Sequence, residues 1–196
     1  MRFAGRTAGR LAAVTIALLA PLLVHAQVGD TGRARAGSPP FAAVVVRVVD
    51  GDTVWIQDAA NRRARWAKVR IQGIDAPESC QPGGVASREA LLRKVMDQRV
   101  RVSPLGRDDY GRLLARLSIG PAAADGDVGG WMVKNGQAWS YRFRADAGPY
   151  ASEQRRARSA QRGLFADPAA EEPREFRKRH GPCPMPARLS VRPGAR

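Results

Sequence analysis

Acidic and basic residues crowd into one stretch at residues 70–78, with the sequence Arg-Ile-Gln-Gly-Ile-Asp-Ala-Pro-Glu. Pro77 fixes its own φ and disfavours the helical conformation at Ala76. The carboxylates of Asp75 and Glu78 are therefore expected on a stiff, extended corner of the chain. Asp-Ala-Pro-Glu is also an ordinary turn sequence, so this stretch alone is open to two interpretations, a reactive site and a solvated turn.

Two further turns carry residues of the same chemical kinds. Asp50-Gly-Asp52-Thr is a second acidic turn upstream, and Tyr110-Gly-Arg112 places a second arginine downstream of the first one, Arg70. Carboxylate oxygens are ligands of hard cations, and the planar guanidinium group binds phosphate through paired hydrogen bonds. Together the three turns predict a site that combines an oxygen-bound cation with an arginine-bound phosphate.

The counts of histidine and cysteine exclude other kinds of site. The two histidines are His25, in a segment expected to be removed, and His180, in a polar tail. A Ser-His-Asp relay therefore has no histidine near the three turns. Two cysteines, Cys80 and Cys183, cannot supply a four-thiolate zinc site. Any bound metal would be held mainly through oxygen, and from the residues alone both calcium and magnesium stay open.

The N-terminus has the pattern of a secretory signal peptide. Arginines at positions 2, 6 and 10 precede an apolar run at 11–24, and residues 24–26 resemble a small-residue cleavage site. We expect cleavage after Ala26 and bacterial export to the periplasm or the medium; a retained anchor is the alternative. In an oxidising compartment, Cys80 and Cys183 are expected to form a disulfide rather than act as nucleophiles.

The charge balance indicates a polyanionic partner. The chain has 33 basic and 18 acidic residues, and loss of residues 1–26 removes three arginines and no acid, so the net charge falls from +15 to +12. A nucleic-acid backbone is the commonest partner of such a surface; solvated arginines in a basic proteome are the alternative. From the residues we expect a nucleic-acid partner, no stable membrane insertion after cleavage, and a monomer.

Apolar spacing predicts the elements that must position these residues. Alternating or β-branched runs predict five strands, at residues 41–49, 53–56, 65–72, 99–102 and 113–119. Helical spacing with suitable termini predicts three helices, at residues 85–97, 128–135 and 149–162. The predicted fold class is therefore α+β, a β-barrel plus helices: a partly open, five-stranded OB-fold with about three α-helices.

The length suits one domain with extensions. We expect a signal peptide at 1–26, a linker at 27–40, one globular domain at 41–167 and a basic, Pro-rich tail at 168–196. The tail is expected to lack regular structure, with residues 175–177 as a segment able to dock.

Three motifs of this chain resemble the staphylococcal (micrococcal) nuclease family. They are Val-Val-Asp-Gly-Asp-Thr-Val at 48–54, Val-Arg-Ile-Gln-Gly-Ile-Asp-Ala-Pro-Glu at 69–78 and Asp-Tyr-Gly-Arg-Leu-Leu-Ala at 109–115. They occur in the family's order, and the similarity extends over about residues 44–167. The resemblance implies an OB-fold endonuclease: a secreted, calcium-dependent phosphodiesterase that cleaves DNA and RNA with little sequence specificity and leaves 3′-phosphate ends.

The resemblance also implies roles for the acidic corner. The calcium ligands fall on Asp52, Asp75 and the backbone carbonyl of Ala76. Glu78 matches the glutamate proposed to activate the attacking water. Cys80 and Cys183 are a departure from the best-known member of the family, and a disulfide between them would pin the tail next to this corner.

Four residues match the family's phosphate-binding and nucleotide-binding positions. Arg70 and Arg112 match the two arginines that hold the scissile phosphate. Tyr110 and Tyr141 match tyrosines around the nucleotide, and core packing is the alternative for Tyr141. For Asp108, a solvated turn acid is preferred over support of an arginine.

Two rival functions remain at this stage. Family members with eroded sites serve as non-catalytic nucleic-acid-binding OB modules, and the persistence of all five acidic and arginine positions favours the enzyme. A polybasic binder of the cell envelope is a weaker alternative, which predicts association that survives salt able to abolish DNA binding.

Overall fold

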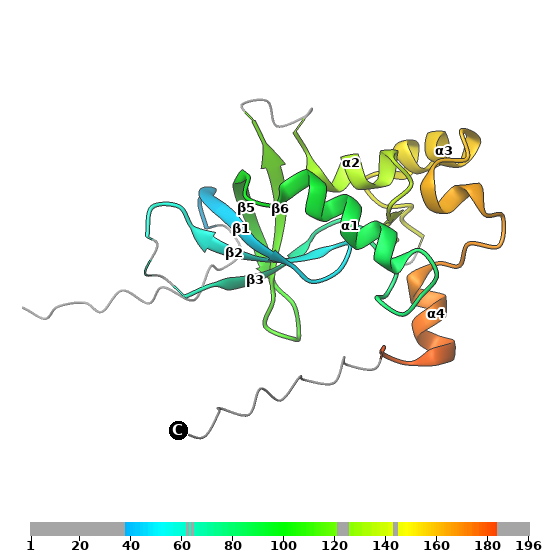
Figure 1. Ribbon diagram of the computed structural model, residues 1–196, viewed down its shortest axis with the longest axis horizontal. Helices are drawn as coiled ribbons and strands as arrows, with labels where there is room; N and C mark the ends of the chain where they lie inside the picture. Colours follow the sequence, from blue (N-terminus) through cyan, green and yellow to red (C-terminus); the bar gives the residue numbers. More distant parts are fainter. Residues whose placement is uncertain (1–37, 62, 64, 121–125, 143–144, 184–196) are drawn as a thin grey trace, which may run out of the picture. The chain divides into compact units, whose positions relative to one another are not determined.

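The computed structural model describes residues 38–61, 63, 65–120, 126–142 and 145–183 (Figure 1). The expected signal peptide at 1–26 and most of the expected linker lie outside the described residues. Among the residues that are described, no helix is both long and apolar enough to span a bilayer.

Five strands form a closed barrel (Figure 1). In chain order they are β1 (Phe41–Val48), β2 (Thr53–Asp58), β3 (Ala67–Ile71), β5 (Arg99–Arg107) and β6 (Leu113–Ile119). Around the barrel they neighbour one another in the order β1-β2-β3-β6-β5, and β5 pairs back with β1. All these pairings are antiparallel except that of β3 with β6, which is parallel. The predicted five-stranded barrel with helices is therefore confirmed, although the barrel is closed and not partly open as expected.

The barrel core is filled by residues that alternate along the strands. Ala43 and Val45 of β1, Val69 and Ile71 of β3, and Val102 of β5 are all buried, whereas their immediate neighbours are more exposed. Alternation of this kind follows from the two-residue period of a strand with one face inward. Valine and isoleucine dominate because branched side chains pack well on a pleated surface.

Helices pack against the barrel. The three predicted helices are present with shorter bounds, as α1 (Gly84–Val95), α2 (Val128–Lys134) and α3 (Ala151–Ser159). Leu91 of α1 and Met132 of α2 are fully buried in the same core as the strands. A short 3-10 helix, η1 (Gly163–Ala166), follows α3, and a two-stranded sheet pairs β4 (Ile74–Asp75) with β7 (Trp139–Ser140).

The prediction for the tail was wrong in part. A fourth helix, α4 (Pro173–His180), forms where no regular structure was expected. It begins with proline, a residue suited to the first turn of a helix. Phe176 is buried against the rest of the chain, so the docking expected for residues 175–177 is present. Figure 1 shows α4 in orange near the start of α1, where a disulfide joins Cys80 to Cys183.

Candidate active site

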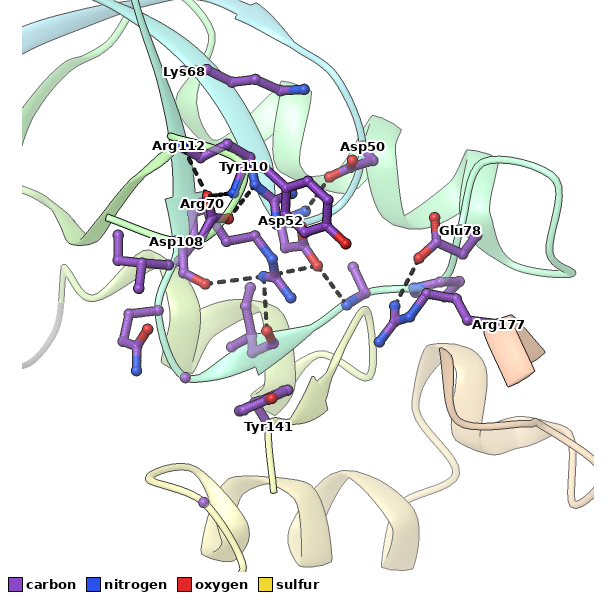
Figure 2. A pocket seen from close by; sticks show the side chains of 18 of the residues that line it. Asp50, Asp52, Lys68, Arg70, Glu78, Asp108, Tyr110, Arg112, Tyr141 and Arg177 are labelled. Carbon is purple, nitrogen blue, oxygen red and sulfur yellow. Dashed lines mark hydrogen bonds and ion pairs between the residues drawn. The ribbon is translucent and has the colours of Figure 1, made fainter. Parts of the chain in front are cut away.

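Most of the predicted site residues line one open cavity of about 1030 Å³ (Figure 2), and Asp75 contacts two of its lining residues, Arg70 and Arg177. They come from the β1–β2 turn, from β3, from the corner after β4, from the β5–β6 loop and from the end of β7. The charged and aromatic side chains that line the cavity include Asp50, Asp52, Arg70, Glu78, Asp108, Tyr110, Arg112, Tyr141 and, from α4, Arg177. Folding therefore brings together residues that are as far apart in the chain as Asp50 and Arg177.

Pairing of β2 with β3 places the first acidic turn beside Arg70. Thr53 is the register partner of Arg70, so Asp52, just before β2, lies next to it. The Thr53 hydroxyl donates to Asp52 Oδ1 over 2.9 Å, and the Ala76 amide donates to Asp52 Oδ2 over 2.9 Å. Asp52 is thus tied directly to the second acidic corner, 24 residues further along the chain.

A tight turn at Gly73 positions the second carboxylate, that of Asp75. Gly73 has a φ of 86°, a conformation that favours glycine, and a Cβ at this position would meet Pro149 Cγ at only 2.7 Å. The chain then enters β4, where Asp75 pairs with Trp139 of β7. Asp75 is only 4% exposed, comparable with Asp52 at 6%. Both carboxylates are therefore held on paired backbone in a largely dry position.

The guanidinium of Arg70 bridges these two carboxylates. Its Nη1 lies 2.9 Å from Asp52 Oδ2, and its Nη2 lies 3.2 Å from Asp75 Oδ1. Nη1 also donates to the carbonyls of Ile74, over 2.9 Å, and Ile71, over 3.1 Å. The sequence predicted a phosphate-binding role for Arg70, whereas its contacts in this structure hold the two acids together.

Burial of several acids raises their affinity for protons. The pKa of Asp75 is raised by burial, with an opposing hydrogen bond from Arg177 and a further increase from the charge of Asp52. Burial, followed by the charge of Asp52, raises the pKa of Asp50 to about 7. A cation placed among these groups would favour their ionised forms, because opposite charge lowers the pKa of a carboxyl.

The donor set fits a hard cation that accepts ligands other than side chains. Asp52 and Asp75 offer two buried carboxylates, and Ala76 lies in hydrogen-bond contact with Asp52. Within the described part of the chain, no three acidic, histidine or cysteine side chains form a complete metal site on their own. The remaining ligands would have to be carbonyl and water oxygens, which calcium accepts readily.

Asp108 organises the loop that carries Arg112. Asp108 Oδ2 accepts from Arg112 Nε over 2.5 Å, and Asp108 Oδ1 accepts from the backbone amides of Arg112, over 2.8 Å, and Tyr110, over 3.1 Å. Burial would raise the pKa of Asp108, but the hydrogen bonds from Arg112 outweigh it and the pKa is lowered. The preference for a solvated turn acid was therefore wrong: Asp108 orients Arg112.

The two tyrosines lie at the rim of the cavity. Tyr110 is 85% exposed, and its ring centroid lies 5.4 Å from Cζ of Arg112. Tyr141 is 41% exposed and follows β7, where its amide donates to the Gly73 carbonyl over 2.9 Å. The core-packing alternative for Tyr141 is therefore wrong, and both rings are accessible from the cavity.

Glu78 faces a residue that the sequence did not place in the site. Its Oε1 accepts from Arg177 Nη1 over 2.7 Å. The same guanidinium also binds both carboxylate oxygens of Asp75, with Nη1 3.2 Å from Oδ1 and Nη2 3.0 Å from Oδ2. Figure 2 shows Glu78 and Arg177 on the opposite side of Asp52 from Arg112. The available signal was the docking segment 175–177, six residues before Cys183.

Known proteins share this sequence pattern. Residues 68–167 match the family described as "Staphylococcal nuclease homologue". A protein of Shigella flexneri named "Micrococcal nuclease" is 36% identical over 147 residues, which cover 70% of this chain and 81% of that protein. "Protein ParB" of Escherichia coli is 36% identical over 152 residues, covering 72% and 83%. An "Uncharacterized endonuclease" of Haemophilus influenzae is 34% identical over 134 residues, covering 68% and 71%.

Proposed function

This chain belongs to the staphylococcal nuclease family, and from that premise we propose that it is a secreted, calcium-dependent endonuclease. Its substrates would be DNA and RNA, cut with little sequence specificity to leave 3′-phosphate ends. The observation that carries the proposal is that Asp52, Glu78 and Arg112 line one cavity, with Asp75 joined to it through Arg70 and Arg177. Export rests on the signal-like pattern of residues 1–26.

The residues that would hold calcium are Asp52, Asp75 and the backbone carbonyl of Ala76. Their oxygens match the ligand preference of the ion, which accepts water at its other positions. When bound, calcium supplies positive charge that stabilises the negative charge developing on the attacked phosphate. Arg70 keeps the two carboxylates in register beside that position.

Arg112 would bind the non-bridging oxygens of the phosphate. A guanidinium does this through two parallel hydrogen bonds, which strengthen as charge builds on those oxygens. Asp108 holds Arg112 through Nε, the edge of the guanidinium nearest the backbone. This contact fixes the orientation of the guanidinium and leaves its two Nη groups to bind the phosphate.

Glu78 would accept the proton of the attacking water. A carboxylate that lines the cavity and is partly open to solvent can act as a general base on water next to the phosphate. The water oxygen then forms a bond to phosphorus as the bond to the 5′-oxygen breaks, and the 5′-oxygen takes a proton from solvent water, so that the products are a 3′-phosphate and a 5′-hydroxyl. Tyr110 and Tyr141 stand where nucleotide bases or phosphates flanking that bond can touch them.

Digestion of labelled nucleic acids tests this function. Single-stranded DNA, duplex DNA and RNA would be incubated with calcium, with magnesium and with a chelator. The variants Glu78→Gln and Arg112→Ala would be compared with wild type and with Arg101→Ala, a control at an exposed position of β5. We expect calcium-dependent cleavage by wild type and the control, and little by the two site variants.

The same assay separates the enzyme from a non-catalytic binding module. If wild type binds the nucleic acids but cleaves none of them with either metal, the catalytic proposal fails and the binding module replaces it. End-group analysis of the products completes the test, because 5′-phosphate ends would contradict the proposed bond cleavage.

A further inference from the structure

We propose that Arg177 is a built-in competitor of the metal ion: a guanidinium, carried by α4, that occupies Asp75 and Glu78 and thereby sets the site's affinity for divalent cations. The inference rests on the proposed calcium site and goes beyond it. It concerns a residue outside the three motifs that define the site in the sequence.

Arg177 occupies one of the carboxylates that a cation in the site would need, together with the proposed general base. Its guanidinium binds both oxygens of Asp75, at 3.2 and 3.0 Å, and one oxygen of Glu78, at 2.7 Å. One positive group therefore engages a proposed metal ligand and the proposed general base together. With Arg70 on the other side, Asp75 Oδ1 already accepts from two guanidiniums.

A bound divalent cation and this position of Arg177 exclude each other. Hydrogen bonds between ionised groups are short, strong and directional, so Arg177 uses the lone pairs of Asp75 that a metal would take. Two guanidiniums already share the buried carboxylate of Asp75, so a divalent cation beside both of them would add strong repulsion, because the interior screens charge poorly. Metal binding must therefore displace Arg177, and the cost of displacement weakens the apparent affinity.

Arg177 is placed so that it can leave. Its side chain is 38% exposed, against 6% for the side chain of Asp75. Burial disfavours the charge of Arg177, yet its pKa is raised, because Asp75 and Glu78 stabilise the guanidinium. The group is thus held by its two acidic partners, and it can swing into the open part of the cavity when a metal replaces it.

Several contacts hold α4 against the site and keep the competitor close. The disulfide joins Cys183, just after α4, to Cys80, two residues after Glu78. Just before α4, the Glu171 carbonyl accepts from Gln81 Nε2 over 2.8 Å. A group tethered next to its binding site acts at a high effective concentration, so even a modest intrinsic affinity competes well with a free ion.

Calorimetric titration of the full, folded chain with calcium chloride tests the competition without relying on activity. Arg177→Gln keeps much of the side chain's length and removes its charge. The matched control is Arg179→Gln, on the same helix, which removes an arginine that pairs with Glu171 outside the cavity. We expect Arg177→Gln to bind calcium about tenfold more tightly than wild type, and Arg179→Gln to bind like wild type.

Each other outcome has a definite meaning. Equal affinity of wild type and Arg177→Gln overturns the competition and leaves the calcium site intact. Weaker binding by Arg177→Gln also overturns it, because Arg177 would then position Asp75 for the metal. An equal gain in both variants overturns it too, since net charge alone would explain the effect. If none of the proteins binds calcium, the metal site of the proposed function fails, and the inference falls with it.

Removing the disulfide provides a second, independent test of the competition. The double variant Cys80→Ser/Cys183→Ser releases the end of α4, so we expect it to bind calcium more tightly than wild type. Combined with Arg177→Gln it should add nothing further, because the competitor is already absent. Additive gains, or an affinity unchanged from wild type, would contradict the role of the disulfide as the tether.

Discussion

The two sides of the cavity are built differently. On the barrel side, Asp52, Asp75 and Arg70 sit on paired strands or tight turns, and the Arg70 side chain is only 14% exposed. By contrast, Arg112 and Arg177, which lie on opposite sides of Asp52 in Figure 2, come from a loop and from α4 and are 26% and 38% exposed. The difference indicates that the proposed calcium ligands are preorganised, whereas these two arginines can adjust.

Replacing Arg70 should have the largest effect, because it tests the barrel side. Arg70→Ala leaves the buried carboxylates of Asp52 and Asp75 without their shared counter-charge. We expect the free energy of unfolding to fall by about 3–5 kcal/mol, together with loss of cleavage. Urea denaturation followed by circular dichroism measures the first quantity. An unchanged free energy of unfolding in this variant would show that Arg70 does not stabilise the buried carboxylates.

Replacing Arg112 should separate activity from stability. We expect Arg112→Ala to lower the cleavage rate by about 10²–10³ but the free energy of unfolding by less than about 1 kcal/mol, because the Arg112–Asp108 pair is partly solvated. Steady-state cleavage assays and urea denaturation of the same preparation give both values. A loss of stability as large as that of Arg70→Ala would erase the proposed difference between the two sides.

Replacing Asp108 should have a smaller effect, acting through Arg112. Asp108→Asn keeps an oxygen for the loop's backbone amides but removes the charged acceptor of Arg112 Nε. We expect kcat/KM to fall about tenfold, equivalent to about 1.4 kcal/mol. The neighbouring Asp109→Asn, at an exposed position, is the control. If the two variants have equal activity, Asp108 does not orient Arg112.

The smallest expected effect concerns how the contribution of Asp108 to thermal stability depends on pH. The pKa of Asp108 is lowered from its ordinary value of 3.8 in the folded chain, so its ionised form stabilises the fold above that pH. This contribution is lost as pH falls through the lowered pKa. Wild type should therefore melt above Asp108→Asn at pH 7, and the two melting temperatures should converge in strong acid. A constant difference at every pH would contradict the assignment.

The barrel and most of the site could be predicted because their signals are local. Val69 and Ile71 alternate with polar neighbours, a pattern that predicts a strand without knowledge of its packing. The three motifs placed the acids and Arg112 on turns and Arg70 on that strand. Strands as short as β4 and β7 carry no such period, so their pairing, which fixes Asp75, could not be seen.

The disulfide let the sequence place the tail near the acidic corner, but the role of Arg177 could not be predicted, for a different reason. Helix α4 is short, and Arg177 is one of several basic residues within it, so nothing local marks it. Its position depends on the distant disulfide and on burial of Phe176. Asp108 was misjudged similarly, because its role depends on the turn that folds Arg112 back over it.

A crystal structure of the protein with calcium and a phosphorothioate dinucleotide tests the central claim most directly. The account predicts one calcium ion bound by both Asp52 and Asp75, the phosphorothioate group on Arg112, and Arg177 displaced from Asp75. Calcium bound elsewhere, or a phosphorothioate group out of reach of Arg112, would contradict it.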